Sequence, residues 1–238
     1  MSQLKIAENV ALIKDRIEKA ARAAGRSPEE ITLVAATKTN SADLVAEAIK
    51  AGINVCGENR VQELVEKNAQ GAYNGASLHF IGHLQKNKVN KLVGVCDLIQ
   101  SVDSLELLEA IDSRAKALGR TQDILIEINI GGEISKSGID ESELTKILEK
   151  AESFSCVFIR GLMAIPPISG SESENRACFA RMRQLFIDNS AKKYDNVSMD
   201  FLSMGMSGDF EAAIAEGSNM VRVGSAIFGV RVYPPKAD

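Results

Sequence analysis

The feature that most constrains the fold is a regular alternation of short apolar runs with helix-like segments along the whole chain. Eight runs have the length and the apolar character of buried strands: ITLVAAT (31–37), INVCGE (53–58), LHFIGH (78–83), DLIQSV (97–102), DILIEINI (123–130), CVFIRGLMAI (156–165), VSMDFLSMG (197–205) and MVRVG (220–224). Apolar strands separated by helices form a parallel sheet that is covered on both faces. Eight such units predict an α/β fold, a closed (β/α)8 barrel.

The segments between the strands carry helix signals. SADLVAEAIKAG (41–52), DSLELLEAIDSRAKALG (103–119) and DESELTKILEKAES (140–153) each begin with Ser or Asp as N-cap, and the first two end at Gly. Near the start of the chain, Ile6, Val10, Ile13 and Ile17 follow helical spacing. They predict an extra N-terminal helix, packed on the outside of the barrel or across its bottom.

The rival architecture is an open doubly wound sheet. A dinucleotide fingerprint would place glycines after the first strand, but LVAATKTNSADL (33–44) contains none. Because no Pro/Ser-rich linker divides the chain, we expect residues 1–238 to form a single barrel domain. PPISGSESEN (166–175) is predicted to be a mobile loop beside the active site.

Composition excludes several classes of partner. The formal net charge is −4, and no cluster of Lys and Arg alternates with aromatic residues, which argues against nucleic acid. No apolar run approaches the roughly 20 residues that span a bilayer, so no membrane contact is expected. The N-terminal segment lacks the apolar core and cleavage site of a signal peptide. We therefore expect a cytoplasmic protein.

No metal site is expected. The cysteines form no CxxC pair and are interpreted as buried thiols without metal or redox chemistry: Cys56, Cys96, Cys156 and Cys178. His79 and His83 would share one face of a strand, but no third ligand is evident.

The loops after strands seven and eight of such a barrel commonly bind phosphate. The sequence places Ser207 and Gly208 at the predicted start of a helix, where free N–H groups favour an anion. Gly224 and Ser225 form a second turn of small residues. Either turn alone is better explained as an N-cap or a bend, but on adjacent strands they predict a phosphate cradle.

Two cationic residues point to further chemistry at the same end of the barrel. Arg222 lies inside a buried strand, where an unpaired guanidinium is costly, so we expect it to pair with a ligand. Lys38 directly follows the first strand, and desolvation and a neighbouring cation would lower its pKa. A neutral amine there suits a Schiff base with a carbonyl substrate or with pyridoxal 5'-phosphate. Glu58 and Asn59 are expected at the same rim, Asn59 suited to bonding a ring hydroxyl.

The motifs resemble a known family over nearly the whole chain. TKT (37–39), GENRVQE (57–63), HFIGHLQKNK (79–88), INIGGEISKSGI (128–139), GLMAIPP (161–167) and the segment 203–229 are similar, in this order, to the YggS/PROSC pyridoxal phosphate homeostasis proteins. The resemblance implies a barrel of the alanine racemase N-terminal domain type that carries pyridoxal phosphate without established catalytic turnover. It implies these places around the cofactor: Lys38 for the Schiff base, Asn59 and Met204 near the ring, Arg222 facing the pyridine nitrogen, and Ser207, Gly224 and Ser225 at the phosphate.

Three functions are compatible with such a site. The first is a protein that buffers pyridoxal phosphate and delivers it to apo-enzymes, as a monomer or weak dimer. The second is an amino-acid racemase, which needs an added β domain and a tyrosine base; the tyrosines of this chain, Tyr73, Tyr194 and Tyr233, follow no predicted strand end. The third is a lyase that uses Lys38 on a ketone, but beyond Glu58 no acid/base pair is evident. We favour the carrier.

Overall fold

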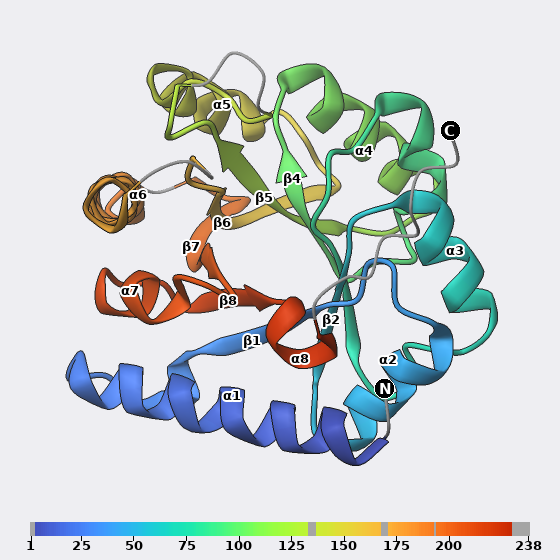
Figure 1. Ribbon diagram of the computed structural model, residues 1–238. Coiled ribbons are helices and arrows are strands. Elements are labelled where there is room, and N and C mark those ends of the chain that lie inside the picture. The colour runs from blue at the N-terminus through green and yellow to red at the C-terminus, as the bar shows by residue number, and fades with distance from the viewer. Residues whose placement is uncertain (1–2, 133–136, 168–170, 193, 230–238) are drawn as a thin grey trace, which may run out of the picture.

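Eight parallel strands close into a barrel in the order in which they occur in the chain, and β1 pairs with β8 to complete it (Figure 1). The computed structural model describes residues 3–132, 137–167, 171–192 and 194–229. The strands are β1 Thr32–Ala36, β2 Val55–Glu58, β3 Ser77–Phe80, β4 Leu98–Val102, β5 Gln122–Ile128, β6 Val157–Ala164, β7 Val197–Met206 and β8 Met220–Val223. The predicted barrel is thereby confirmed, and no strand extends more than one residue beyond its expected segment.

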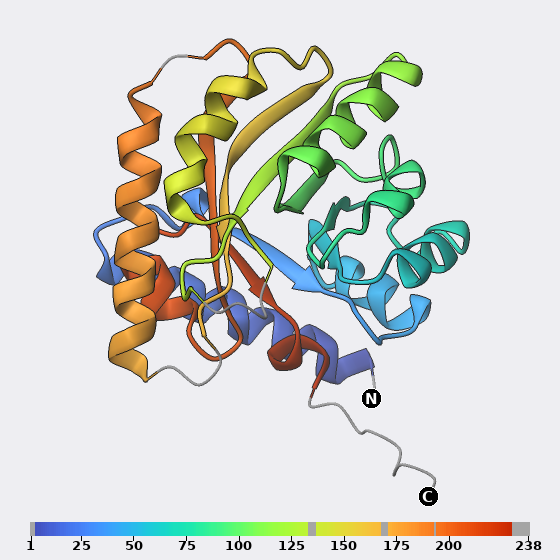
Figure 2. The same ribbon diagram turned by 90° about the horizontal axis from the view of Figure 1, so that it is seen from above.

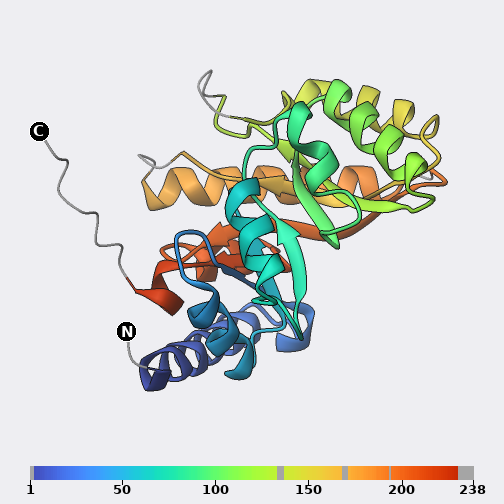
Figure 3. The same cartoon turned by 90° about the vertical axis from the view of Figure 1, so that its right-hand side faces the viewer.

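The helices lie around the outside of this sheet (Figures 2 and 3). They are α1 Gln3–Ala23, α2 Ala42–Lys50, α3 Val61–Ala69, α4 Leu105–Ala117, α5 Leu144–Ala151, α6 Glu172–Ser190, α7 Phe210–Ala215 and α8 Ser225–Phe228, with 3₁₀ turns η1 Pro28–Glu30, η2 Lys86–Lys91 and η3 Glu141–Glu143. The hydroxyl of Ser41 accepts a hydrogen bond from the first turn of α2, as predicted. In α4 the N-cap is Ser104, one residue after the predicted Asp103. Asp140 caps η3, which leads directly into α5.

The N-terminal helix takes a place in the outer ring that the eighth repeat leaves open. α8 has only four residues, and α1 packs beside α2, α7 and α8 along β1 and β8 (Figure 1). Ile6, Val10 and Ile13 are buried on its inner face, and Asn9 Nδ2 donates to the Ile227 carbonyl over 2.8 Å. The extra helix is therefore packed on the outside of the barrel.

The buried apolar side chains form two hydrophobic cores, one inside the barrel and one between the sheet and the helices. The smaller core fills the barrel and comprises Val34, Leu98, Leu125, Met163 and Met220. The larger core joins the outer faces of the strands to the helices. Because side chains alternate along a strand, neighbouring residues on β1 and β2 face different cores. This alternation decides which side chains reach the mouth of the barrel.

One predicted segment is shorter than expected. Ser171 is the N-cap of α6, so residues 172–175 form the first turn of that helix and not part of a loop. The hydroxyl of Ser171 and the carboxylate of Glu174 bond reciprocally to each other's backbone N–H, which stabilises the helix start. Residues 168–170 of the predicted loop lie outside the described residues. Among the described helices, none combines the length and apolar character of a membrane span.

Candidate functional site

The predicted site residues follow the carboxyl ends of four neighbouring strands. β1 pairs with β2 on one side and with β8 on the other, and β8 pairs with β7. Lys38 follows β1, Asn59 follows β2 and Ser207 follows β7, while Gly224 follows β8. A Cβ atom added at Gly224 would lie 3.3 Å from the Cβ and the carbonyl oxygen of Ala36, so the ends of β1 and β8 are in close contact. The structure thus brings these residues to one end of the barrel.

Arg222 lies inside the barrel wall and is 4% exposed. Its Nη1 donates to Ser203 Oγ over 2.5 Å, and its Nη2 donates to the Ala164 carbonyl over 2.9 Å. Burial lowers the pKa of this guanidinium to about 10, although Glu127 and Asp209 counteract the effect, so Arg222 is charged at neutral pH. Both acceptors are neutral, so they satisfy two N–H donors without pairing the charge, and the expectation that Arg222 pairs with a ligand stays a prediction.

A chain of hydrogen bonds runs from Arg222 through the barrel interior. Ser203 Oγ donates to Gln100 Oε1 over 2.7 Å, and Gln100 Nε2 lies 2.9 Å from His79 Nδ1. Burial lowers the pKa of His79 to about 4, so its ring is neutral at neutral pH and Nδ1 accepts from the amide. Sequence reasoning missed Ser203 and Gln100, although a polar Gln100 inside the apolar run DLIQSV was a usable signal.

The loops after β7 and β8 contact each other, but not as the sequence predicted. α7 begins at Phe210 with Asp209 as its N-cap residue, so Ser207 lies in the preceding turn and not at a helix start. Ser207 Oγ instead accepts from Gly224 N over 3.2 Å and from Ala226 N over 3.5 Å, across to the other loop. Gly208 borders open space, and Ser225 is exposed. The Ser207 hydroxyl therefore joins the two loops.

Asn59, which follows β2, has an unsatisfied acceptor in its side chain. Its side chain is half-buried, and among the described residues its buried Oδ1 atom has no hydrogen-bond partner. The Asn59 carbonyl would collide with a Cβ at Gly82, so the ends of β2 and β3 meet closely here. A buried amide oxygen without a donor costs free energy. A bound molecule with a hydroxyl or N–H group would satisfy it.

Two residues expected near this site face other surroundings. Glu58 is 0% exposed and lies under α3, where its Oε2 accepts from Lys67 Nζ over 2.7 Å and from Thr37 Oγ1 over 3.0 Å. The expectation that Glu58 reaches the rim was therefore wrong, because it alternates with Asn59 across the strand end. Met204 is fully buried in the larger core with residues of the helices, while neighbouring Ser203 bonds to Arg222.

Sequence reasoning also missed Glu127, a buried acidic residue whose charge interacts with that of Arg222. Burial and the charge of Asp103 raise the pKa of Glu127, on β5, to about 7, against the opposing charge of Arg222. Asp103 Oδ2 lies 3.2 Å from His83 Nδ1. Within the described part of the chain, no cluster of His, Cys, Asp and Glu is arranged to hold a metal ion.

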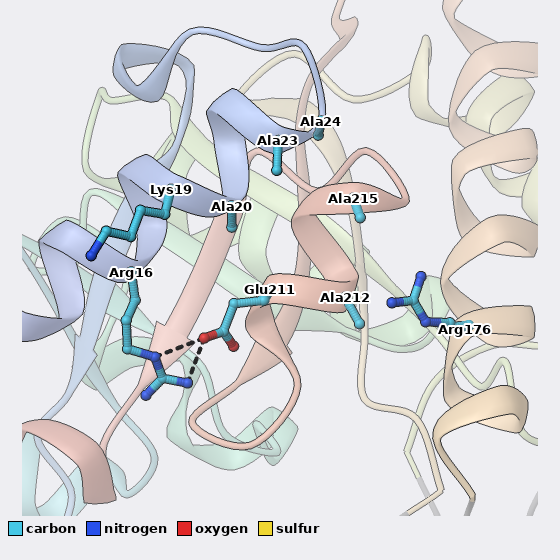
Figure 4. A pocket seen from close by; sticks show the side chains of 9 residues that line it. All are labelled: Arg16, Lys19, Ala20, Ala23, Ala24, Arg176, Glu211, Ala212 and Ala215. Carbon is cyan, nitrogen blue, oxygen red and sulfur yellow. Dashed lines mark hydrogen bonds and ion pairs between the residues drawn. The ribbon is translucent and has the colours of Figure 1, made fainter.

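A groove between α1 and α7 lies on the outside of the barrel (Figure 4). Small side chains of Ala20, Ala212 and Ala215 form its floor, and Arg16 pairs with Glu211 across it over 2.5 Å. This groove contains none of the predicted site residues. The barrel mouth is therefore the stronger candidate for chemistry.

Comparison with known proteins agrees with this geometry. Residues 7–232 match the family model described as alanine racemase, N-terminal domain. The chain is 43% identical over 234 residues to a pyridoxal phosphate homeostasis protein of Escherichia coli, covering 97% of this chain and 99% of the relative. The crystal structure of an unknown protein from Bifidobacterium adolescentis has a TM-score of 0.90 at 38% identity, over 95% of each chain. PipY of Synechococcus elongatus, solved with PLP bound, has a TM-score of 0.82 at 34% identity, over 94% of this chain and 100% of PipY.

These matches define a barrel of the alanine racemase N-terminal type. The chain belongs to the YggS/PROSC family of pyridoxal phosphate homeostasis proteins. Alanine racemase of Streptomyces coelicolor is more distant, with a TM-score of 0.71 at 16% identity, and the match spans 59% of that enzyme. This likeness concerns the fold alone.

Proposed function

We propose that the chain binds pyridoxal 5'-phosphate at the mouth of the barrel, holds it covalently through Lys38 and buffers its supply in the cell. The observation that carries the proposal is the position of Lys38 and Arg222. Lys38 follows β1, and Arg222 lies in β8, which pairs with β1. The joined loops of Ser207 and Gly224 follow β7 and β8 at the same end of the barrel. An amine, a fixed cation and an anion-binding surface are the groups that a phosphorylated aldehyde requires.

The remaining groups fit this cofactor as well. The unsatisfied Asn59 Oδ1 suits the ring hydroxyl, and the exposed hydroxyl of Ser225 and the open space beside Gly208 suit a phosphate. When bound, pyridoxal phosphate supplies an aldehyde for an amine and a ring that delocalises electrons. The proposed places of Lys38, Asn59, Ser207, Arg222, Gly224 and Ser225 are those that the family resemblance implies. Met204 is left out of this set, because its side chain is buried in the larger core.

Arg222 decides whether such a site retains the cofactor or activates it. A guanidinium has only donors, so Arg222 can hydrogen-bond a pyridine nitrogen only when that nitrogen carries no proton. The pKa of Arg222, about 10, keeps the side chain charged at neutral pH. An unprotonated ring delocalises electrons poorly. Residues 1–238 are thus proposed to form one binding domain that holds the cofactor without efficient turnover.

The relatives support a role without turnover, because they are named homeostasis proteins and not enzymes. In the proposal the protein works in the cytoplasm as a monomer or weak dimer, and it exchanges the cofactor with apo-enzymes. The alternative is a racemase, which must move protons on both faces of its substrate. Tyr73 is buried beside Glu58 under α3, and Tyr194 pairs with the first residue of β7, so neither follows the carboxyl end of a strand. Tyr233 lies outside the described residues.

Incubation with an amino acid tests the absence of turnover. We expect the protein loaded with pyridoxal phosphate to produce no D-alanine from L-alanine at catalytic rates, because general acid–base help worth about 10²–10⁴-fold is missing on one face. Chiral chromatography after prolonged incubation measures the product, with the Lys38→Ala variant as the background. Racemisation at about 1 s⁻¹ or faster, as in true enzymes, would establish the racemase instead.

A further inference from the structure

A buried ion-pair cluster lies outside the barrel wall, directly behind the residue proposed to hold the cofactor. Lys67 of α3 is 7% exposed and Glu58 of β2 is 0% exposed, and Nζ lies 2.7 Å from Oε2. Tyr73 adds a third contact to the same carboxylate oxygen, over 3.4 Å. Burying two charges is costly, and their attraction often fails to offset the loss of hydration. Because this ion pair is a poor source of stability, we look for another role of the cluster.

The cluster forms hydrogen bonds with the backbone on both sides of Lys38. Before it, Lys67 Nζ donates to the Thr37 carbonyl over 2.9 Å. After it, Glu63 Oε2 accepts from Thr39 N over 2.7 Å. Lys67 and Glu63 are one helical turn apart on α3 and are themselves 3.2 Å apart. One helix face therefore holds both peptide groups that flank Lys38.

The backbone after Lys38 needs such support. Thr39 has a φ of 65°, a left-handed conformation that is unfavourable for a β-branched residue. Burial raises the pKa of the Glu63 carboxyl, but the hydrogen bond from Thr39 and the charge of Lys67 outweigh this and lower it below its usual range. Glu63 is therefore an anion at neutral pH, and its hydrogen bond to Thr39 N is charge-assisted.

We propose that Glu58, Glu63 and Lys67 form an α3 clamp that fixes the backbone around Lys38 and thereby aims the Lys38 amine into the barrel mouth. The inference rests on the proposed function. The three residues are positioning residues, because they act through the backbone and contact no cofactor. Condensation requires the amine nitrogen to approach the aldehyde carbon, replace its oxygen and release that oxygen as water. A fixed backbone lowers the entropy that this approach costs.

Two ligands distinguish the effect of positioning the Lys38 amine from the binding that the rest of the site provides. Pyridoxal 5'-phosphate can condense with the amine, whereas 4-deoxypyridoxine 5'-phosphate has the same ring and phosphate without the aldehyde. We expect Glu63→Ala to weaken binding of the aldehyde roughly tenfold or more, the loss expected for one charge-assisted hydrogen bond. Binding of the deoxy analogue should stay at the wild-type value, because the loops and Arg222 are untouched.

Two variants control for a purely structural effect. Glu66→Ala changes an exposed carboxylate on the same helix, and it should leave both affinities unchanged. Glu63→Gln keeps an oxygen that can accept from Thr39 N, and it should restore most of the aldehyde binding. Titration by fluorescence quenching gives both affinities, and thermal unfolding shows that each variant is folded. Lys67→Met, where it folds, should repeat the selective loss.

The outcomes are separable. An equal loss of both ligands in Glu63→Ala, or no loss of either, would overturn the clamp and leave the cofactor site intact. A wild-type protein that binds neither ligand would overturn the proposed function, and the clamp with it.

Discussion

At the scale of single residues, the site depends on a directed chain of hydrogen bonds. Arg222 donates to Ser203, Ser203 donates to Gln100, and Gln100 donates to the unprotonated Nδ1 of His79. Each group donates a hydrogen bond to the next group, so all the bonds of the chain run in one direction. Protonation of His79 would remove the final acceptor. The orientation of Arg222 is therefore linked to a neutral histidine in the barrel interior.

The pH dependence of stability tests this residue. Burial lowers the pKa of folded His79 to about 4, below its unfolded value of 6.5. Between these values the unfolded chain binds a proton that the folded chain does not, so stability is lost as the pH falls from 6.5 toward 4. The loss should reach about 3 kcal/mol, at 1.36 kcal/mol per pKa unit. Urea unfolding of the wild type and of His79→Gln measures it.

The comparison with His79→Gln is needed because Glu127 changes the stability with pH in the opposite direction to His79. The pKa of folded Glu127 is raised to about 7, so this group makes the protein less stable as the pH rises from about 4.5 to 7. The difference between the two proteins cancels that contribution. Parallel stability curves for wild type and His79→Gln would show that His79 is not neutral in the folded state.

At the scale of elements, the loops after β7 and β8 are joined by one hydroxyl. Ser207 accepts from two backbone N–H groups of the neighbouring loop, whereas Ser225 is exposed at the first residue of α8. The sequence located both turns because small residues follow both strands. It misplaced the start of α7 by two to three residues, since Ser207 and Asp209 are both good N-cap residues and only the tertiary contact of Ser207 distinguishes them.

Serine substitutions in these two loops should have different effects. Ser207→Ala and Ser225→Ala should each weaken binding of pyridoxal phosphate roughly 10- to 100-fold, the loss of one hydrogen bond to a charged group. Only Ser207→Ala should also lower the free energy of unfolding, by about 1 kcal/mol, because it removes the contact between the loops. Cofactor titration and urea unfolding of both variants and of the double variant measure these effects. Unchanged affinity in the double variant would argue against a phosphate at these loops.

At the scale of the whole molecule, the barrel was predictable because its strands are nearly continuous apolar runs separated by capped helices. For α1 the sequence left two places open, the outside of the barrel and its bottom. Which one it takes depends on the shortness of α8, which packing decides. Within the site, Lys38, Asn59 and Arg222 were recognisable as polar residues at strand ends. Glu58 was misplaced because alternation across a strand end depends on register. Gln100 was recognisable as a polar residue in an apolar run, whereas Ser203 and Glu127 gave no motif.

The central claim is that Lys38 holds pyridoxal phosphate at the barrel mouth. Borohydride reduction of the loaded protein, followed by proteolysis and peptide mass spectrometry, tests it most directly, because reduction makes the carbon–nitrogen bond permanent. We expect one phosphopyridoxyl group per chain, located on Lys38 and lost in Lys38→Ala. A group on a different lysine of the wild type, or undiminished labelling of Lys38→Ala, would contradict the claim.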